Sequence, residues 1–65
     1  MNELTKSDEL LDTRKAAEYL TLKPQTLDLW RTTKRVAIPY LKLGRSVRYR
    51  RGDLTAYLER SVVTD

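Results

Sequence analysis

The sequence contains no cysteine and no histidine, and each absence excludes a kind of functional site. Without cysteine, the chain can form neither a disulfide nor a thiolate metal site. Without histidine, it lacks the commonest general base and the commonest neutral metal ligand. No carboxylate cluster and no glycine-rich phosphate loop takes their place. We therefore expect no enzymatic activity, no bound metal and no small-molecule cofactor.

Long apolar runs are missing as well. The longest run is far shorter than the about 20 residues of a membrane-spanning helix, and residues 1–9 lack the apolar centre of a signal peptide. Together with the absence of cysteine, these features favour a cytoplasmic protein with no membrane partner. A chain of 65 residues forms one domain, which buries only about 60% of its unfolded surface. We expect this domain at 10–62, between a disordered tail at 1–9 and a frayed end at 63–65.

Positive charge is concentrated in the middle of the chain. Nine of the 13 Lys and Arg residues lie between Lys23 and Arg51, against the single acid Asp28, so this window has a net charge of +8. Both flanking segments carry more acids than bases. Double-stranded DNA, with one negative charge for about every 1.7 Å of its axis, is the partner that such a window indicates. A merely solvated surface is the alternative, but the cations alternate with structural residues, which favours DNA binding.

Apolar spacing and capping residues predict two helices in the first half. Asp12 and Thr13 are good N-caps, and the apolar stripe after them predicts a helix at 13–20. After a three-residue turn, Pro24 suits the first position of a second helix at 24–33. The residues expected to face the core are Ala16, Ala17, Leu20, Leu22, Leu27 and Trp30. The residues expected on the opposite, outward face of the second helix are Gln25, Asp28, Leu29 and Thr32.

Two alternating runs around Gly44 predict a β-hairpin. Its buried face would hold Leu41, Leu43, Val47 and Tyr49, and its other face Lys42, Arg48 and Arg50. Residues opposite each other in a hairpin point to the same side, so Leu43 should pair with Val47. That pairing needs a three-residue loop, residues 44–46, and this is our prediction. A two-residue loop would set Leu41 opposite Arg48 and divide the apolar face.

A third helix is expected at 52–61. Its apolar stripe would consist of Leu54, Tyr57, Leu58 and Val62. The order is therefore helix, turn, helix, hairpin, helix, and the fold class is mainly α with a β-hairpin: a winged helix-turn-helix with a two-stranded wing. A second helix with a polar outward face can enter a major groove, while a basic wing contacts the adjacent backbone or minor groove.

Two segments carry a family resemblance. They are LLDTRKAAEYLTLKPQTLDLWR at 10–31 and IPYLKLGRSVRYRRGDLTAYLE at 38–59. They resemble the small excisionase/AlpA group of winged helix-turn-helix DNA-binding proteins, distant relatives of the MerR DNA-binding domain. The matching motifs lie at Thr13–Leu20, Pro24–Trp30, Leu43–Arg50 and Asp53–Leu58. Two positions depart from the family pattern: Lys23 replaces the usual Ser or Thr cap, and Asp28 stands where Arg is frequent.

The resemblance implies a sequence-specific double-stranded DNA-binding protein of a bacterium or phage. One implied role is an excisionase: an architectural recombination directionality factor that acts with an integrase on a mobile element, together with neighbouring copies of itself. The other is a small AlpA-like transcriptional regulator. A protein-interaction module such as an anti-repressor is a further alternative. RNA binding is disfavoured, because no sheet carries an aromatic stacking platform.

The candidate DNA-binding residues lie on the second helix, at its ends and on the wing. They are Lys23, Gln25, Thr26, Asp28, Leu29, Arg31, Thr32, Lys34, Arg35, Lys42, Arg45, Arg48 and Arg50.

Several of these residues, and one core residue, have two interpretations. Asp28 could accept a hydrogen bond from cytosine N4 or pair with Arg31 within the helix. Leu29 could meet a thymine methyl group or be an ordinary exposed leucine. Arg48 and Arg50 could be solvated strand residues or form a basic strip on the wing. Trp30 could stack on a base, but its spacing favours the core.

Overall fold

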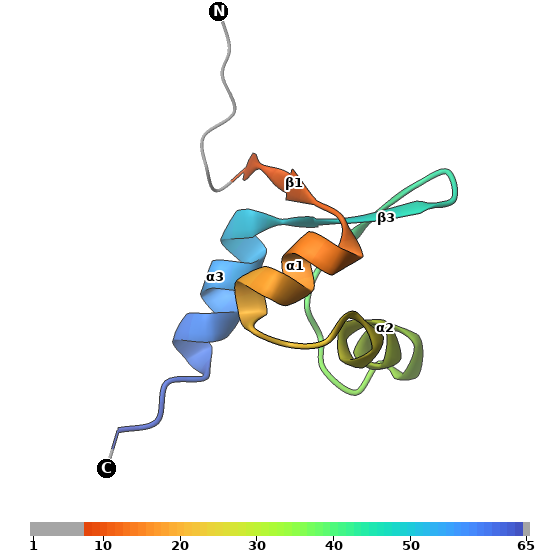
Figure 1. The fold of residues 1–65 in the computed structure, drawn as a ribbon. Coiled ribbons are helices and arrows are strands. Elements are labelled where there is room, and N and C mark those ends of the chain that lie inside the picture. The colour runs from red at the N-terminus through yellow and green to blue at the C-terminus, as the bar shows by residue number, and fades with distance from the viewer. Residues whose placement is uncertain (1–7, 65) are drawn as a thin grey trace, which may run out of the picture.

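The computed structural model describes residues 8–64, and helix α1 lies at the centre of the fold. Figure 1 shows α1 between α3 and α2, with the strands along one side. In chain order, the elements are β1 (Leu10–Leu11), α1 (Thr13–Leu20), α2 (Pro24–Thr33), β2 (Leu41–Leu43), β3 (Ser46–Arg50) and α3 (Arg51–Arg60). This is a winged helix-turn-helix, as predicted. The bounds of the first two helices agree with the prediction, and the third is displaced by one residue.

Local signals explain where the helices begin and end. The Asp12 side chain accepts a hydrogen bond of 2.8 Å from the backbone N–H of Lys15 and caps α1. At the other end, Thr21 adopts a left-handed conformation with φ of 63°, which stops the helix. Pro24 begins α2, and Lys23 before it makes no side-chain cap bond, as its departure from the family pattern implies. The two helices are thereby held in the short turn of a helix-turn-helix.

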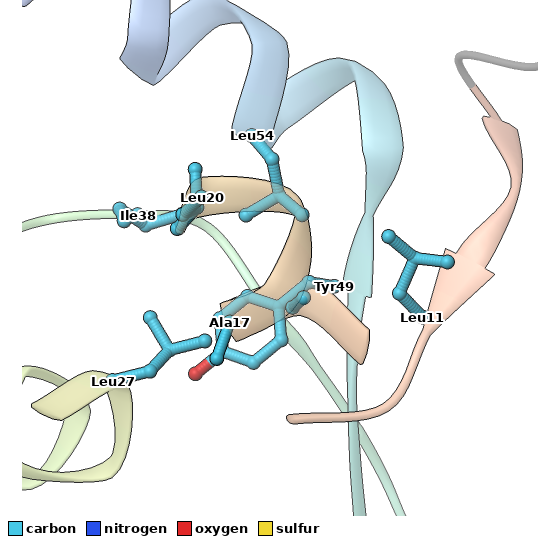
Figure 2. Packing of buried hydrophobic residues seen from close by; sticks show 8 residues of the cluster. Leu11, Ala17, Leu20, Leu27, Ile38, Tyr49 and Leu54 are labelled. Atoms are coloured by element: carbon cyan, nitrogen blue, oxygen red, sulfur yellow. The ribbon is translucent and has the colours of Figure 1, made fainter. Parts of the chain in front are cut away.

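The core forms where small side chains on α1 allow close approach. Ala16 and Ala17 have no exposed surface, so the neighbouring elements can pack directly on α1. Figure 2 shows side chains from α1, α2, α3, β1, β3 and the connector before β2 converging there. The buried residues are Leu11, Ala16, Ala17, Leu20, Leu27, Ile38, Tyr49 and Leu54. Trp30 and Tyr57 are partly buried against this cluster. Their two rings meet edge to face, with centroids 6.0 Å apart. The core assignment of Trp30 is thereby confirmed.

The sheet has one strand more than expected. Strand β3 lies in the middle, between β1 and β2, and both neighbours are antiparallel to it. In the β1 pairing, Leu10 is opposite Arg50 and Leu11 is opposite Tyr49. Two residues are too few to show an alternating pattern, so no local signal indicates β1. The strand forms because Leu11 can be buried against α1 and Tyr49.

The chain just before β1 is tied to the start of α3. The backbone N–H of Arg51 donates to the carbonyl of Glu9 over 2.9 Å, and the two side chains form an ion pair, also of 2.9 Å. The Arg51 guanidinium also lies 5.1 Å above the ring of Tyr19 in α1. Glu9, which we assigned to the tail, is therefore part of the fold. Residues 1–7 of that predicted tail, and Asp65 of the predicted frayed end, lie outside the described residues.

The predicted hairpin register is wrong. Leu41 is opposite Arg48, Lys42 is opposite Val47 and Leu43 is opposite Ser46, so the loop has two residues, Gly44 and Arg45. Gly44 has φ of 63°, the conformation of a glycine at the first central position of a type II′ turn, whose twist matches that of the two strands. The preference for this turn outweighs the apolar alternation, because the hairpin extends beyond the core cluster and Leu43 is half exposed there.

The last predicted apolar positions are also wrong. Leu54 is fully buried and Tyr57 partly buried, but Leu58 is 37% exposed and Val62 is 71% exposed. Helix α3 ends at Arg60, and Val62 lies beyond it. The stripe therefore covers the core only at the beginning and middle of the helix.

Candidate nucleic-acid interface

Helix α2 presents a polar face to solvent, as predicted. Gln25, Asp28, Leu29 and Thr32 are all exposed, while Leu27 on the opposite side is buried. Half of Leu29 is accessible, with an exposed fraction of 51%. Thr26, another predicted contact, is half-buried at the margin of this face. The exposed face carries amide, hydroxyl, carboxylate and methyl groups, which are the chemical groups that read base edges in a major groove.

Asp28 and Arg31 form an ion pair with a distance of 2.9 Å between Oδ1 and Nη2. This contact is the intrahelical alternative considered for Asp28. The hydrogen bond that Arg31 donates to Asp28 is the largest cause of a raised pKa of Arg31. Only 22% of the Arg31 side chain is exposed, against 52% for Asp28. The guanidinium is therefore held in place and its charge is partly compensated.

Arg31 also connects α2 to the wing. Its guanidinium lies 5.8 Å above the ring of Tyr40, just before β2, and Tyr40 in turn packs on Tyr49 at 6.2 Å. The buried position of Tyr49 raises the pKa of its hydroxyl, and the nearby positive charge of Arg31 opposes that rise. A single arginine thus contacts the carboxylate on its own helix and the aromatic pair at the base of the wing. These contacts link α2 to the base of the hairpin.

The hydroxyl of Thr32 is directed back to its own helix. Its Oγ1 atom donates to the carbonyl oxygens of Asp28 and Leu29 over 3.1 and 3.2 Å. The hydroxyl proton is therefore used within the helix, and the oxygen lone pairs are left to accept from a base amino group. Gln25 is exposed and offers both amide donors and a carbonyl acceptor.

Cations surround both ends of α2. Lys23 is exposed at its N-terminus, and Lys34 and Arg35 are exposed just after its C-terminus. Lys34 has a left-handed backbone, with φ of 57°, which turns the chain away from the helix axis. Next to it lies a pocket of about 420 Å³ lined by Arg31, Lys34 and residues 36–40.

The wing cations are divided between the two faces of the sheet. Lys42 is on the face of Val47, which packs against the core, and Arg45 is exposed at the tip. Arg48 and Arg50 are on the outward face: Arg48 is half-buried and donates from Nη1 to the carbonyl of Val47, and Arg50 lies 3.9 Å from the carboxylate of Asp53. The expected strip of Lys42, Arg48 and Arg50 is therefore wrong, since the two-residue loop separates Lys42 from the others.

The hairpin tip and α2 lie on the same side of the molecule, opposite α3 (Figure 1). The structure therefore brings together the α2 residues, the cations at its ends, Lys42 and Arg45. It does not bring Arg48 and Arg50 to this region, because both lie further from the tip along β3 and are engaged there, Arg48 with the carbonyl of Val47 and Arg50 with Asp53. Tyr40 and Leu43 belong to this region although we did not assign them to it. The Gly-Arg dipeptide at 44–45, a two-residue turn signal, could have indicated the exposure of Leu43.

Within residues 8–64, no group of three or more acidic residues is arranged to hold a metal ion. In the same part of the chain, no helix is long and apolar enough to cross a membrane.

An exposed polar helix in a helix-turn-helix, beside a basic wing tip, defines a class of DNA-binding proteins. The chain matches the model of a family described as a helix-turn-helix domain over residues 10–62, and it belongs to that family. Membership of a small helix-turn-helix DNA-binding family, predicted from the motifs, is thereby confirmed. No curated protein matches the chain.

Proposed function

We propose that this protein binds a specific double-stranded DNA site and acts as an excisionase: an architectural factor that directs an integrase toward excision of a mobile element. The observation that carries the DNA-binding part is the position of α2 and the wing tip on the same side of the molecule (Figure 1). Between Asp28 and Asp53 the chain has no acidic residue. A duplex that approaches this side therefore meets cations along the rest of this segment, and Asp28 is the one acid on the exposed face of α2.

In this proposal, α2 enters the major groove and its residues have two roles. Gln25 and Thr32 read base edges, Leu29 lies against a thymine methyl group, and Thr26 supports them from the margin of the helix. The exposed cations Lys23, Lys34, Arg35, Lys42 and Arg45 contact phosphates and set the register of the helix in the groove.

The excisionase role is supported by the four motifs that resemble excisionases. The same motifs favour a second candidate, a small AlpA-like transcriptional regulator that acts by occupying its site. Both roles require binding to a specific DNA site, and only the excisionase role also requires an integrase. In the excisionase case, we expect neighbouring copies of the protein on adjacent direct repeats, since bending a longer stretch of DNA needs several copies.

The first experiment selects bound duplexes from a random pool and then compares variants on the selected site. Gln25→Ala and Thr32→Ala should reduce discrimination against mismatched sites by about 1–3 kcal/mol. Lys34→Ala and Arg35→Ala should weaken binding to all duplexes by similar factors. Lack of any preferred sequence, or equal effects of both pairs on all duplexes, would contradict the assignment of α2 as the reading helix.

The second experiment adds the integrase encoded closest to this gene. An excisionase should protect repeats inside the attachment site and increase the yield of excised circles from a supercoiled substrate. Protection within a promoter, with repression and unchanged recombination, would identify the regulator instead. A docking module such as an anti-repressor would bind a protein partner in the presence of excess competitor DNA.

A further inference from the structure

Leu43 is an exposed leucine in the most cationic part of the protein. It is the last residue of β2, directly before the Gly44-Arg45 turn, and it is 50% exposed. The wing therefore carries an apolar side chain on its outward sheet face, directly next to the tip, and the tip lies on the side of the molecule where α2 lies (Figure 1).

Folding does not account for a leucine at this position. The residue opposite it is Ser46, which is small and itself exposed, so Leu43 has no apolar partner across the hairpin. Leu41, two residues earlier on the same sheet face, is half-buried opposite Arg48. The core cluster and the apolar side chains packed against it do not include Leu43. A polar side chain would satisfy the hairpin equally well.

The charges around Leu43 restrict what it can contact. Lys42 precedes it, Arg45 follows two positions later, and both are exposed. The nearest acids along the chain are Asp28 and Asp53, far from the tip in sequence. Lone exposed leucines are common and need no explanation, but this one lies between two cations on a projecting turn. Its partner must therefore be anionic on its outer surface and apolar inside.

The DNA minor groove has that combination. Phosphates line its edges, while sugar carbons and base edges line its walls and floor. Proteins that bend DNA through the minor groove insert apolar side chains, including leucine, against or between base pairs, and the duplex then kinks toward the major groove. A two-residue turn is a narrow projection, which suits a groove only about 6 Å wide.

We propose that Leu43 is an apolar wedge that the wing inserts into the minor groove beside Arg45, and that it produces part of the bend that the protein imposes on its site. Arg45 neutralises a phosphate at the groove edge and Lys42 a second one. The inference rests on the proposed DNA-binding function and gives the architectural role a specific residue.

The test compares Leu43→Ser with a matched control on the same sheet face. The control is Leu10→Ser, because Leu10 also lies on the outward face, opposite Arg50, is 40% exposed and is far from the tip. Both variants should melt within about 4 °C of the wild type, since exposed substitutions change stability little. Affinity is measured by fluorescence anisotropy on the selected duplex, and bending by energy transfer between dyes at its ends.

We expect Leu43→Ser to lower affinity about three- to tenfold, which is the contribution of the exposed half of a leucine on burial, and to reduce the bend. Leu43→Phe should retain the bend, since a larger ring can also act as a wedge. Leu10→Ser should change neither quantity. Unchanged affinity and bend in Leu43→Ser would overturn the proposal, and so would equal losses in the Leu10 control.

Arg45→Ala and Gln25→Ala distinguish a failure of the wedge proposal from a failure of the proposed DNA binding. If both weaken binding and Leu43→Ser does not, DNA binding stands and the wedge is wrong. If neither weakens binding, the proposed function itself fails. Loss of binding to a protein partner in Leu43→Ser, with the DNA measurements unchanged, would assign Leu43 to a protein contact and likewise overturn the wedge.

Discussion

Among single residues, Arg31 joins α2 to the base of the wing at the candidate interface. It pairs with Asp28 at 2.9 Å, lies over Tyr40 at 5.8 Å and is largely covered. These contacts make it a positioning residue that links α2 to the base of the wing. Asp28, for its part, places a negative charge on the face that would approach phosphate, where it opposes binding.

The first prediction concerns Asp28→Asn. Removing the carboxylate frees the Arg31 guanidinium for phosphate and eliminates a repulsive charge. Binding to all duplexes should therefore become tighter, and the slope of log K against log salt should become steeper by about 1. Titrations of labelled duplexes at several salt concentrations measure this. An unchanged slope combined with lost preference for one C·G pair would instead show that Asp28 reads cytosine.

The second prediction concerns the capping residue Asp12. Its carboxylate accepts the backbone N–H of Lys15, and this bond is the main reason why the pKa of Asp12 lies below its usual value of 3.8. A lowered folded pKa means that the stabilisation is present above the unfolded pKa and is lost as the pH falls through the folded one. Thermal melts below pH 4 should therefore show a falling melting temperature.

Asp12→Asn is the control for this effect. Asparagine caps a helix about as well as aspartate, so the variant should be nearly as stable as the wild type at pH 6. Its melting temperature should depend less on pH below 4, because the titrating cap is gone. An identical pH profile in both proteins would assign the acid sensitivity to other carboxylates.

Among the elements, the wing has a tip and a central strand, β3, with different surroundings. Arg45 is exposed at the tip, whereas Arg48 is folded onto the carbonyl of Val47 and projects from the outward face. Only the tip lies on the side of α2 (Figure 1). In the proposed complex the wing therefore contacts DNA with its end, while β3, the central strand, pairs with both β1 and β2.

The third prediction separates these two arginines. Arg45→Ala should weaken DNA binding about five- to tenfold through loss of one charge-assisted contact, with an unchanged melting temperature. Arg48→Ala should have a much smaller effect on affinity. The DNA affinities of the two single variants are compared by equilibrium binding, and their folding is checked by circular dichroism. A larger effect of Arg48→Ala would mean that DNA contacts the middle of β3 and not the tip alone.

For the whole molecule, the number of available cations determines the salt dependence. Arg31 is paired, Arg48 donates to the carbonyl of Val47, and Arg50 lies beside Asp53 at the end of β3 away from the tip. The exposed cations near α2 and the tip are therefore Lys23, Lys34, Arg35, Lys42 and Arg45. Neutralising five phosphates predicts a slope of log K against log salt of about −4 to −5.

This fourth prediction is measured by repeating one titration across salt concentrations with the wild-type protein. Lys34→Ala and Arg45→Ala should each make the slope shallower by about 1. A slope near −1 in the wild type would contradict extensive phosphate contact and favour a protein partner for the basic surface.

The helices and most of the core could be predicted because short-range interactions decide them. Asp12 and Pro24 mark helix starts, and the spacing of Ala16, Ala17 and Leu20 defines a stripe that only a helix can bury. The outward face of α2 follows from the same periodicity. The polar residues predicted on it are exposed in the structure, whereas their contacts with DNA remain predictions.

The strands could not be predicted as well, because their pairing depends on distant residues. Strand β1 exists through Leu11 packing beside Tyr49, which is far away in the sequence. The hairpin register depended on a choice between apolar alternation and turn geometry, and a change of one residue moves every side chain to the other face. The wrong choice placed Leu43 in the core and Lys42 beside Arg48.

The sequence alone thus determined the class of fold, the three helices and the location of the positive charge, since these depend on neighbours within a few positions. Tertiary structure decided which charges remain available: it pairs Arg31 with Asp28 and Tyr40, and it engages Arg48 with the carbonyl of Val47 and Arg50 with Asp53. It also exposes Leu43 at the tip. The physical reason is that the direction of a strand side chain depends on long-range pairing, whereas the face of a helix depends only on its own period.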